Sequence, residues 1–138
     1  MTDLNIAKNG LEGHSICLCK GGERIVRDER GISPMMNLIA SGAELAGYSV
    51  ADVVVGKAAA LLFVKCKIKS VFAKVLSSGA KRILELYGVA YECETLTERI
   101  INRAGTDTCP MEKAVADTDD PEEAYVLLKN QLIVLRKH

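Results

Sequence analysis

The sequence predicts an α/β fold, a three-layer α/β/α sandwich built on one mixed sheet. Two observations support this prediction. Runs rich in β-branched residues alternate with segments of helical composition, and an early hairpin adds antiparallel pairing to strands that helices connect. The chain has 138 residues, 49% of them hydrophobic, which suits a single domain over residues 1–138.

The first part of the chain predicts a short helix and a β-hairpin. Residues 3–11 have helical composition, and residues 15–20 and 23–28 are β-rich runs. Gly21 and Gly22 separate the two runs, and glycines tolerate the positive φ angles of a tight hairpin turn.

A second helix is expected after the hairpin. Ser33 stands before Pro34, which is typical of an N-cap followed by proline at the first helical position. This helix should end near Gly42 or Gly47. Residues 49–52 then have the spacing of a capping box.

The middle of the chain predicts alternating helices and strands. The apolar run 53–66 favours a helix in its second half, whereas its valine-rich start also suits a strand. Residues 68–76 and 89–94 are expected strands around a helix at 80–87, and 98–102 fits a short further strand.

Two more helix starts close the chain. One is Cys109 before Pro110, and the other is Asp120 before Pro121, where Glu123 completes a second capping box. The last helix should pack on the sheet through one apolar face, formed by Ala124, Leu128, Leu132 and Leu135.

Composition excludes several partners. The 18 basic and 18 acidic residues balance to a net charge of zero, so no basic stripe is available for nucleic acid. With no Trp and only 4 Tyr and 2 Phe, a base-stacking platform is not expected either. The longest apolar stretch, 53–64, is too short to span a membrane and contains Lys57.

The cysteines predict a reduced, cytoplasmic protein. Their number is odd, no C-x-x-C pair occurs, and the first residues lack the pattern of a signal peptide. No metal site and no cofactor are expected, because His14 and His138 are isolated. Cys17 and Cys19 are interpreted as small apolar core residues.

The densest group of reactive side chains lies in residues 101–112. Cys109 at the N-cap of a helix would be near the positive end of the helix dipole, which favours the thiolate. Arg103 would add to this effect, whereas Glu112 would oppose it. The structural alternative is that Cys109 only caps the helix while Arg103 and Asp107 hold the loop.

Two further positions could hold an anion. Ser77 and Ser78 lead into a helix start followed by two basic residues, where free amides could bind a phosphate or carboxylate, although an ordinary cap looks the same. Lys57 is a lone charge in an apolar run, and it is either a buried functional amine or a lysine that reaches solvent.

Several segments together resemble a prokaryotic family of cytidine-deaminase-like proteins, domain of unknown function 1893. They are residues 49–52, 55–60, 101–103, 109–115 and 120–124. The resemblance covers nearly the whole chain and implies the sandwich fold of the cytidine deaminases.

The resemblance does not imply deamination. Zinc deaminases need H-x-E at the start of one helix and P-C-x-x-C at the start of the next. The matching positions here are Gly56-Lys57-Ala58 and residues 76–80, which offer neither a zinc ligand nor a general acid.

Two hypotheses of function remain. In the first, the former deaminase cleft, without metal, binds a small anionic or nucleotide-like metabolite. Lys57, Ser77, Ser78, Asn102 and Arg103 then make the polar contacts.

In the second hypothesis, the protein is a metal-independent enzyme. Cys109 acts as nucleophile or transfer thiol, Arg103 binds an anionic substrate, and Asp107 or Glu112 manages protons. A role in assembly alone has no distinguishing mark in the sequence, and a homo-oligomer is expected only by analogy with the deaminases.

Overall fold

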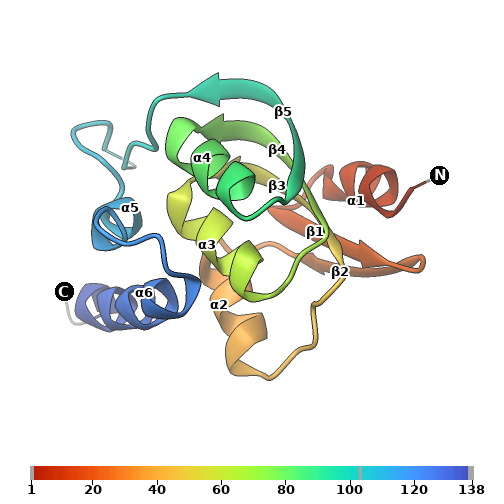
Figure 1. Ribbon diagram of the computed structural model, residues 1–138, viewed down its shortest axis with the longest axis horizontal. Coiled ribbons are helices and arrows are strands. Elements are labelled where there is room, and N and C mark those ends of the chain that lie inside the picture. The colour runs from red at the N-terminus through yellow and green to blue at the C-terminus, as the bar shows by residue number, and fades with distance from the viewer. Residues whose placement is uncertain (1, 103, 137–138) are drawn as a thin grey trace.

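The protein forms a five-stranded mixed sheet with strand order β2-β1-β3-β4-β5 in the computed structural model, which describes residues 2–102 and 104–136 (Figure 1). β1 pairs antiparallel with β2 and β3, and β3, β4 and β5 are parallel. The predicted α/β class with a mixed sheet is confirmed. The strands are β1 (Ile16–Lys20), β2 (Glu23–Arg27), β3 (Ser49–Val55), β4 (Ser70–Ser77) and β5 (Ala90–Thr97).

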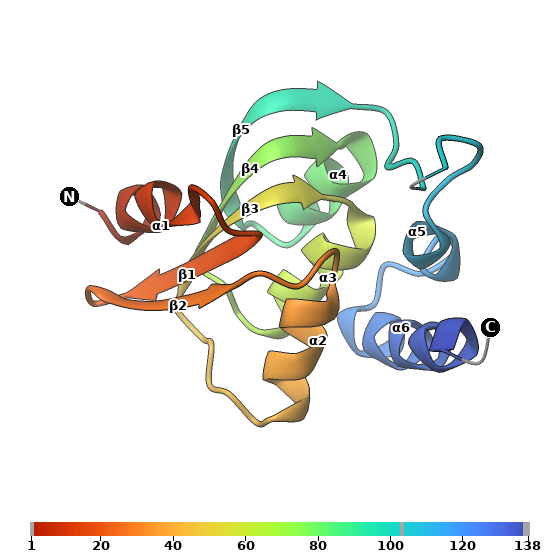
Figure 2. The ribbon, with the colours of Figure 1, turned by 180° about the vertical axis from the view of Figure 1, so that it is seen from behind.

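The helices lie on both sides of this sheet. They are α1 (Asp3–Leu11), α2 (Ser33–Ala40), α3 (Lys57–Lys65), α4 (Ser78–Leu86), α5 (Pro110–Ala114) and α6 (Pro121–Arg136). α1 covers β1 and β3 on one face, whereas α2, α3 and α4 lie on the other face (Figures 1 and 2). No helix in the described part of the chain is long and apolar enough to cross a membrane.

The central strand β3 occupies the segment that the sequence suggested as a capping box. That interpretation is wrong for residues 49–52, because Ser49–Val55 is one strand that pairs with β1 on one side and β4 on the other. The alternative that the valine-rich residues 53–55 form a strand is confirmed. Val50 and Ala51 are both fully buried, on opposite faces of the sheet. The helix begins only at Lys57, after Gly56 in an extended conformation.

Two other local predictions also differ from the structure. Ser33 is the first residue of α2, and Ile32 occupies the N-cap position without a side-chain cap bond. The expected strand at 98–102 is absent, and only an isolated bridge joins Ile101 to Thr108. The segment folds back on residues 107–109 instead, with the Asn102 N–H donating to the Asp107 carbonyl and the Cys109 N–H donating to the Ile100 carbonyl.

The last helix packs against α3 rather than against the sheet. Ala124 and Leu128 of α6 are fully buried, as the sequence predicts, but Leu135 is 44% exposed. The reason is that α2, α3 and α4 already cover this face of the sheet, so α6 adds an outer layer.

The α1 face has its own small core. Cys17 and Cys19 are buried in it beside Ala7 and Phe72, which confirms their interpretation as core residues. α1 approaches β1 so closely that a Cβ on Gly10 would lie 2.7 Å from the Cys17 sulfur atom. This helix position therefore needs a residue without a side chain.

We predict that Gly10→Ala destabilises the protein. Alanine normally favours a helix over glycine by about 1 kcal/mol, but overpacking at the Cys17 sulfur should cost about 1–3 kcal/mol. The measurement is urea unfolding of the two proteins. Adding Cys17→Ala should recover most of the loss, and a Gly10→Ala protein more stable than the parent would contradict the prediction.

Candidate functional site

The two helix starts singled out in the sequence lie side by side. A Cβ on Gly79 would be only 3.5 Å from the Cβ of Lys57. Neighbouring parallel strands cause this, because β3 leads into α3 and β4 leads into α4 at the same edge of the sheet. The structure thus brings Lys57 and the segment with Ser77 close together at Gly79.

A carboxylate of the chain itself occupies the start of α3. Glu112 accepts hydrogen bonds from the backbone N–H of Lys57 at 2.7 Å and of Ala58 at 2.8 Å. A Cβ on Gly56 would overlap this carboxylate. Burial raises the pKa of Glu112, and the two N–H donors counteract this effect. An anion therefore already fills this helix terminus.

A second carboxylate neutralises the basic side chains nearby. Asp119 accepts a bidentate pair from Arg82 at 2.7 and 3.0 Å and lies 3.1 Å from the ammonium of Lys57. The Arg82 and Lys57 cations hold the pKa of Asp119 well below its ordinary value. Lys57 also donates to the carbonyl of Ala116 at 3.1 Å, so its side chain joins α3 to the C-terminal segment.

The two serines have local partners. Ser77 is the N-cap of α4, and its Oγ accepts from the N–H of Ala80 at 3.0 Å. Ser78 donates its hydroxyl to the carbonyl of Thr97 at 3.3 Å. The Ser77 hydroxyl therefore acts as an ordinary helix cap, and the Ser78 hydroxyl contacts the end of β5.

The loop before α5 is held by its own side chains. Asn102 accepts from the N–H of Thr106 at 3.1 Å, and Asp107 bonds to the ammonium of Lys113. The hydrogen bond from Lys113 lowers the pKa of Asp107, and the backbone N–H of Thr108 lowers it further. Arg103, predicted to bind an anion, and His138 lie outside the described residues.

Cys109 occupies the N-cap position of α5, but its thiol makes no cap hydrogen bond. It lines a small cavity of about 90 Å³ between α3, α5 and the loop before α2. Met111, Glu112, Gly31 and Val54 are among its neighbours there. The thiol is therefore placed in a largely apolar recess.

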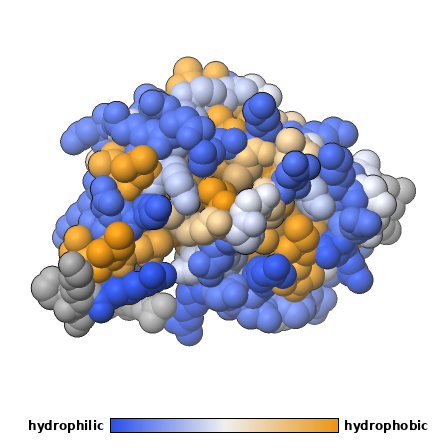
Figure 3. All heavy atoms as spheres, turned by 90° about the horizontal axis from the view of Figure 1, so that it is seen from below, coloured by the Kyte–Doolittle hydropathy of each residue, from blue (hydrophilic) through white to orange (hydrophobic). Residues whose placement is uncertain are grey.

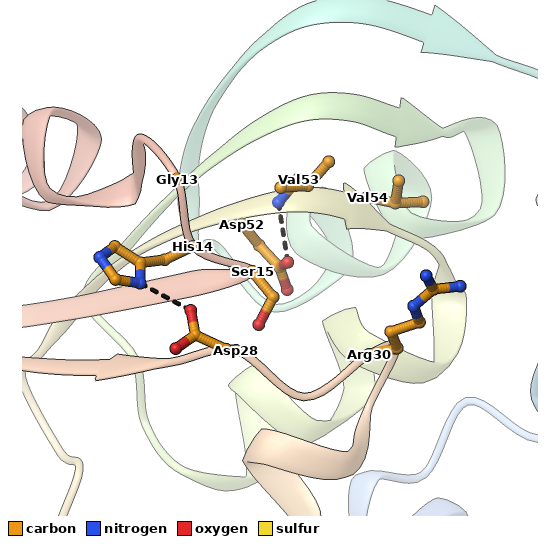
Figure 4. Close-up of a pocket in the computed structure, with 9 residues that line it drawn as sticks. Gly13, His14, Ser15, Asp28, Arg30, Asp52, Val53 and Val54 are labelled. Atoms are coloured by element: carbon orange, nitrogen blue, oxygen red, sulfur yellow. Dashed lines mark hydrogen bonds and ion pairs between the residues drawn. The ribbon is translucent and has the colours of Figure 1, made fainter.

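A larger cleft lies at the carboxyl end of β3, and it has a volume of about 520 Å³ (Figure 4). β1 begins at Ile16, opposite Asp52, so the end of β3 extends past its neighbour. The loop from β2 to α2 forms the opposite wall. Gly31 and Val54 line both this cleft and the small cavity with Cys109, so the two spaces adjoin.

Asp52 is the buried carboxyl group of this cleft. Its residue is 8% exposed, and its Oδ1 accepts from the N–H of Val53 at 2.8 Å. Burial raises the pKa of Asp52 to about 8, although the N–H groups of Val53 and Val54 oppose the shift. At neutral pH the group is therefore mostly a carboxylic acid, which both donates and accepts hydrogen bonds.

No motif in the sequence marks Asp52 as a site residue, because its position also fits the spacing of a capping box. The available signal was an acidic residue inside the apolar run 50–55, since Asp is rarely buried without a specific reason.

Polar side chains surround the mouth of the cleft. His14 Nδ1 lies 2.6 Å from Asp28 Oδ1, and the Ser15 hydroxyl donates to the Arg27 carbonyl at 2.9 Å. Arg30 follows β2 and extends along the cleft (Figure 4). Its guanidinium forms no ion pair with any described residue.

The helix starts do not fit a zinc ion. Zinc needs thiolate, imidazole or carboxylate ligands, and Gly56, Lys57 and Ala58 supply none. Lys57 would also repel a cation. Over residues 2–102 and 104–136, no group of three or more His, Cys, Asp or Glu side chains is arranged to hold a metal.

Comparison with known proteins gives a family and a fold. A family model described as TM1506, domain of unknown function (DUF1893), matches residues 6–132. The chain is similar to the crystal structure of the DUF1893 family protein TM1506 from Thermotoga maritima, with 29% identity and a TM-score of 0.80. That match covers 100% of this chain and 92% of the other. No curated protein matches.

We predict a pH dependence of stability that belongs to Asp52. Its pKa is about 8 in the folded protein and about 4 in the unfolded chain, so the free energy of unfolding is highest at low pH, where the group is protonated in both states. As pH rises from about 4 to about 8, the free energy of unfolding should fall by on the order of 5 kcal/mol. In Asp52→Asn, urea unfolding should show no such decline. Asp28→Asn, which removes an exposed carboxylate of the same cleft, should retain it.

We predict that Glu112→Ala loosens the start of α3. Losing both hydrogen bonds to the helix amides should lower the free energy of unfolding by about 1–3 kcal/mol. Hydrogen exchange at the amides of Lys57 and Ala58 should accelerate, because these groups lose their acceptor. Glu123→Ala on the exposed side of α6 is the matched control. Unchanged exchange at both amides would count against the assigned role of Glu112.

Proposed function

This chain belongs to the DUF1893 family, and we propose that it binds a small anionic, nucleotide-like metabolite in the cleft beside Asp52. The observation that carries the proposal is a buried carboxyl group at a cleft of about 520 Å³. That volume falls within the range typical of small-molecule sites. Burying an acid costs stability, and an uncharged ligand group that pairs with it supplies a reason to retain it.

Asp52 would recognise the head group of the ligand. As a carboxylic acid it offers one donor and one acceptor side by side, and its Oδ1 is already oriented by the N–H of Val53. The edge of a pyrimidine or purine presents the complementary pair of groups. Ser15 lies next to Asp52 in the cleft and adds a hydroxyl (Figure 4).

Arg30 would bind the anionic group. Asp52 is protonated, and Asp28 pairs with His14. The positive charge of the Arg30 guanidinium in this cleft is therefore without a partner among the described residues. A guanidinium binds phosphate or carboxylate through parallel hydrogen bonds. The ligand should therefore carry one such group at the end near Arg30.

This proposal moves the ligand away from the residues that the sequence suggested. Glu112 and Asp119 already satisfy the start of α3 and the Lys57 ammonium. Ser77 and Asn102 are bonded within their own segments. We assign these groups to the frame that positions the cleft.

We further propose that the fold is cytidine-deaminase-like. Support comes from the mixed sheet and from two helices, α3 and α4, whose starts lie together after parallel strands. Zinc deaminases hold their metal at two such helix starts, whereas Lys57 and Ser77 occupy them here. The binding role would thus be metal-independent, and the free cysteines suit a reduced, cytoplasmic setting.

Calorimetric titration with CMP, UMP, AMP and GMP tests the proposal. At least one nucleotide should bind at pH 7, and its affinity should fall as pH rises through about 8, because ionised Asp52 repels an anion. Arg30→Gln should weaken binding by about tenfold or more. Asp52→Asn should remove the decline above pH 7.

Matched variants control the experiment. Arg27→Gln changes an arginine of β2 that does not line the cleft, so affinity should stay constant. Cys109→Ser should also leave binding intact, whereas a thiol-dependent enzyme would lose turnover completely. The proposal fails if no nucleotide binds, or if binding ignores both Arg30→Gln and Asp52→Asn.

A further inference from the structure

The outer side of α6 exposes large apolar side chains. Val126 is 55%, Ile133 is 44% and Val134 is 48% exposed, while Leu127 is half-buried. The opposite side of the helix packs against α3. In Figure 3, apolar side chains gather beside the C-terminal end of the chain, where α6 lies. Contiguous exposed apolar surface of this kind is typical of interaction sites.

The spacing of these residues is that of a helix-pairing seam. Val126 and Ile133 are seven residues apart, and so are Leu127 and Val134. Side chains at this spacing lie on one side of a helix, as in coiled coils. Asn130 stands midway between the four apolar residues, the position at which a polar residue fixes the register of a helix pair.

We propose that α6 pairs antiparallel with α6 of a second copy of this chain. A two-fold axis at Asn130 sets Val126 against the partner's Ile133, and Leu127 against the partner's Val134. Asn130 then meets Asn130 of the partner subunit and can bond to it. The same side of one helix thus complements itself, as a two-fold interface requires.

The charges of α6 fit the same arrangement. Its first turn carries Glu123 beside Glu122, which pairs with Lys65 of the same chain at 2.7 Å, and its last turn carries Arg136. Antiparallel pairing brings the acidic end of each helix to the basic end of the other, whereas parallel pairing would set like charges together. A membrane surface would instead favour a helix rich in Lys and Arg along its polar side.

Sedimentation equilibrium of the full chain tests the pairing. The parent protein should form a dimer, and Val126→Glu and Ile133→Glu should each raise its dissociation constant by at least about tenfold. Leu86 is an exposed apolar residue of α4, 58% exposed, so Leu86→Glu is the matched control and should leave the dimer intact. Circular dichroism checks that each variant folds.

Cross-linking tests the orientation. In a Cys93→Ser background, which removes the exposed thiol, Asn130→Cys should form a disulfide-linked dimer under mild oxidation. Glu123→Cys should not, because an antiparallel pair separates the two copies of this position by about 20 Å. A protein that stays monomeric at all concentrations overturns the proposal. So does a dimer unaffected by the α6 variants, or one in which Glu123→Cys links as readily as Asn130→Cys.

Discussion

Two hydrogen bonds between the Glu112 carboxylate and the first amides of α3 join the C-terminal segment to the sheet domain. They connect groups 54 and 55 residues apart in sequence. The start of a helix attracts anions, so an open α3 terminus would compete for any phosphate. Because Glu112 fills it and Gly56 leaves room for it, this terminus is closed to a further anion, which supports the proposed placement of the ligand at the end of β3.

Two carboxyl groups of this protein, Asp119 and Asp52, differ in protonation because their surroundings differ. Asp119 receives three bonds from cations and stays ionised, which ties α3 and α4 to the segment before α6. Asp52 lacks any cation partner among the described residues and is buried, so it retains its proton to about pH 8. The first is a structural bridge. The second is a group whose protonation can respond to a ligand and to pH.

Local signals predicted the elements well, and contacts between distant segments account for most of the errors. Gly21 and Gly22 identify the hairpin, and the two Pro residues at 110 and 121 mark helix starts. The capping spacing of residues 49–52 also occurs in strands, and only pairing with β1 and β4 makes Ser49–Val55 the central strand. The partner of Glu112 could not be predicted for the same reason. The burial of Asp52 depends on the antiparallel pairing that sets it opposite the start of β1 at Ile16, which no pattern around Asp52 encodes.

Lys57, Glu112 and Asp119 join α3 and α4 to the C-terminal segment. Glu112 accepts from the first amides of α3, and Lys57 donates to the Ala116 carbonyl. Asp119 bonds to both Lys57 and Arg82 of α4. Asp119 is shared by two cations, so these contacts form a network rather than an isolated surface pair. These contacts occupy Lys57 and Glu112, so the proposed ligand would meet the polar groups of the neighbouring cleft, Asp52 and Arg30.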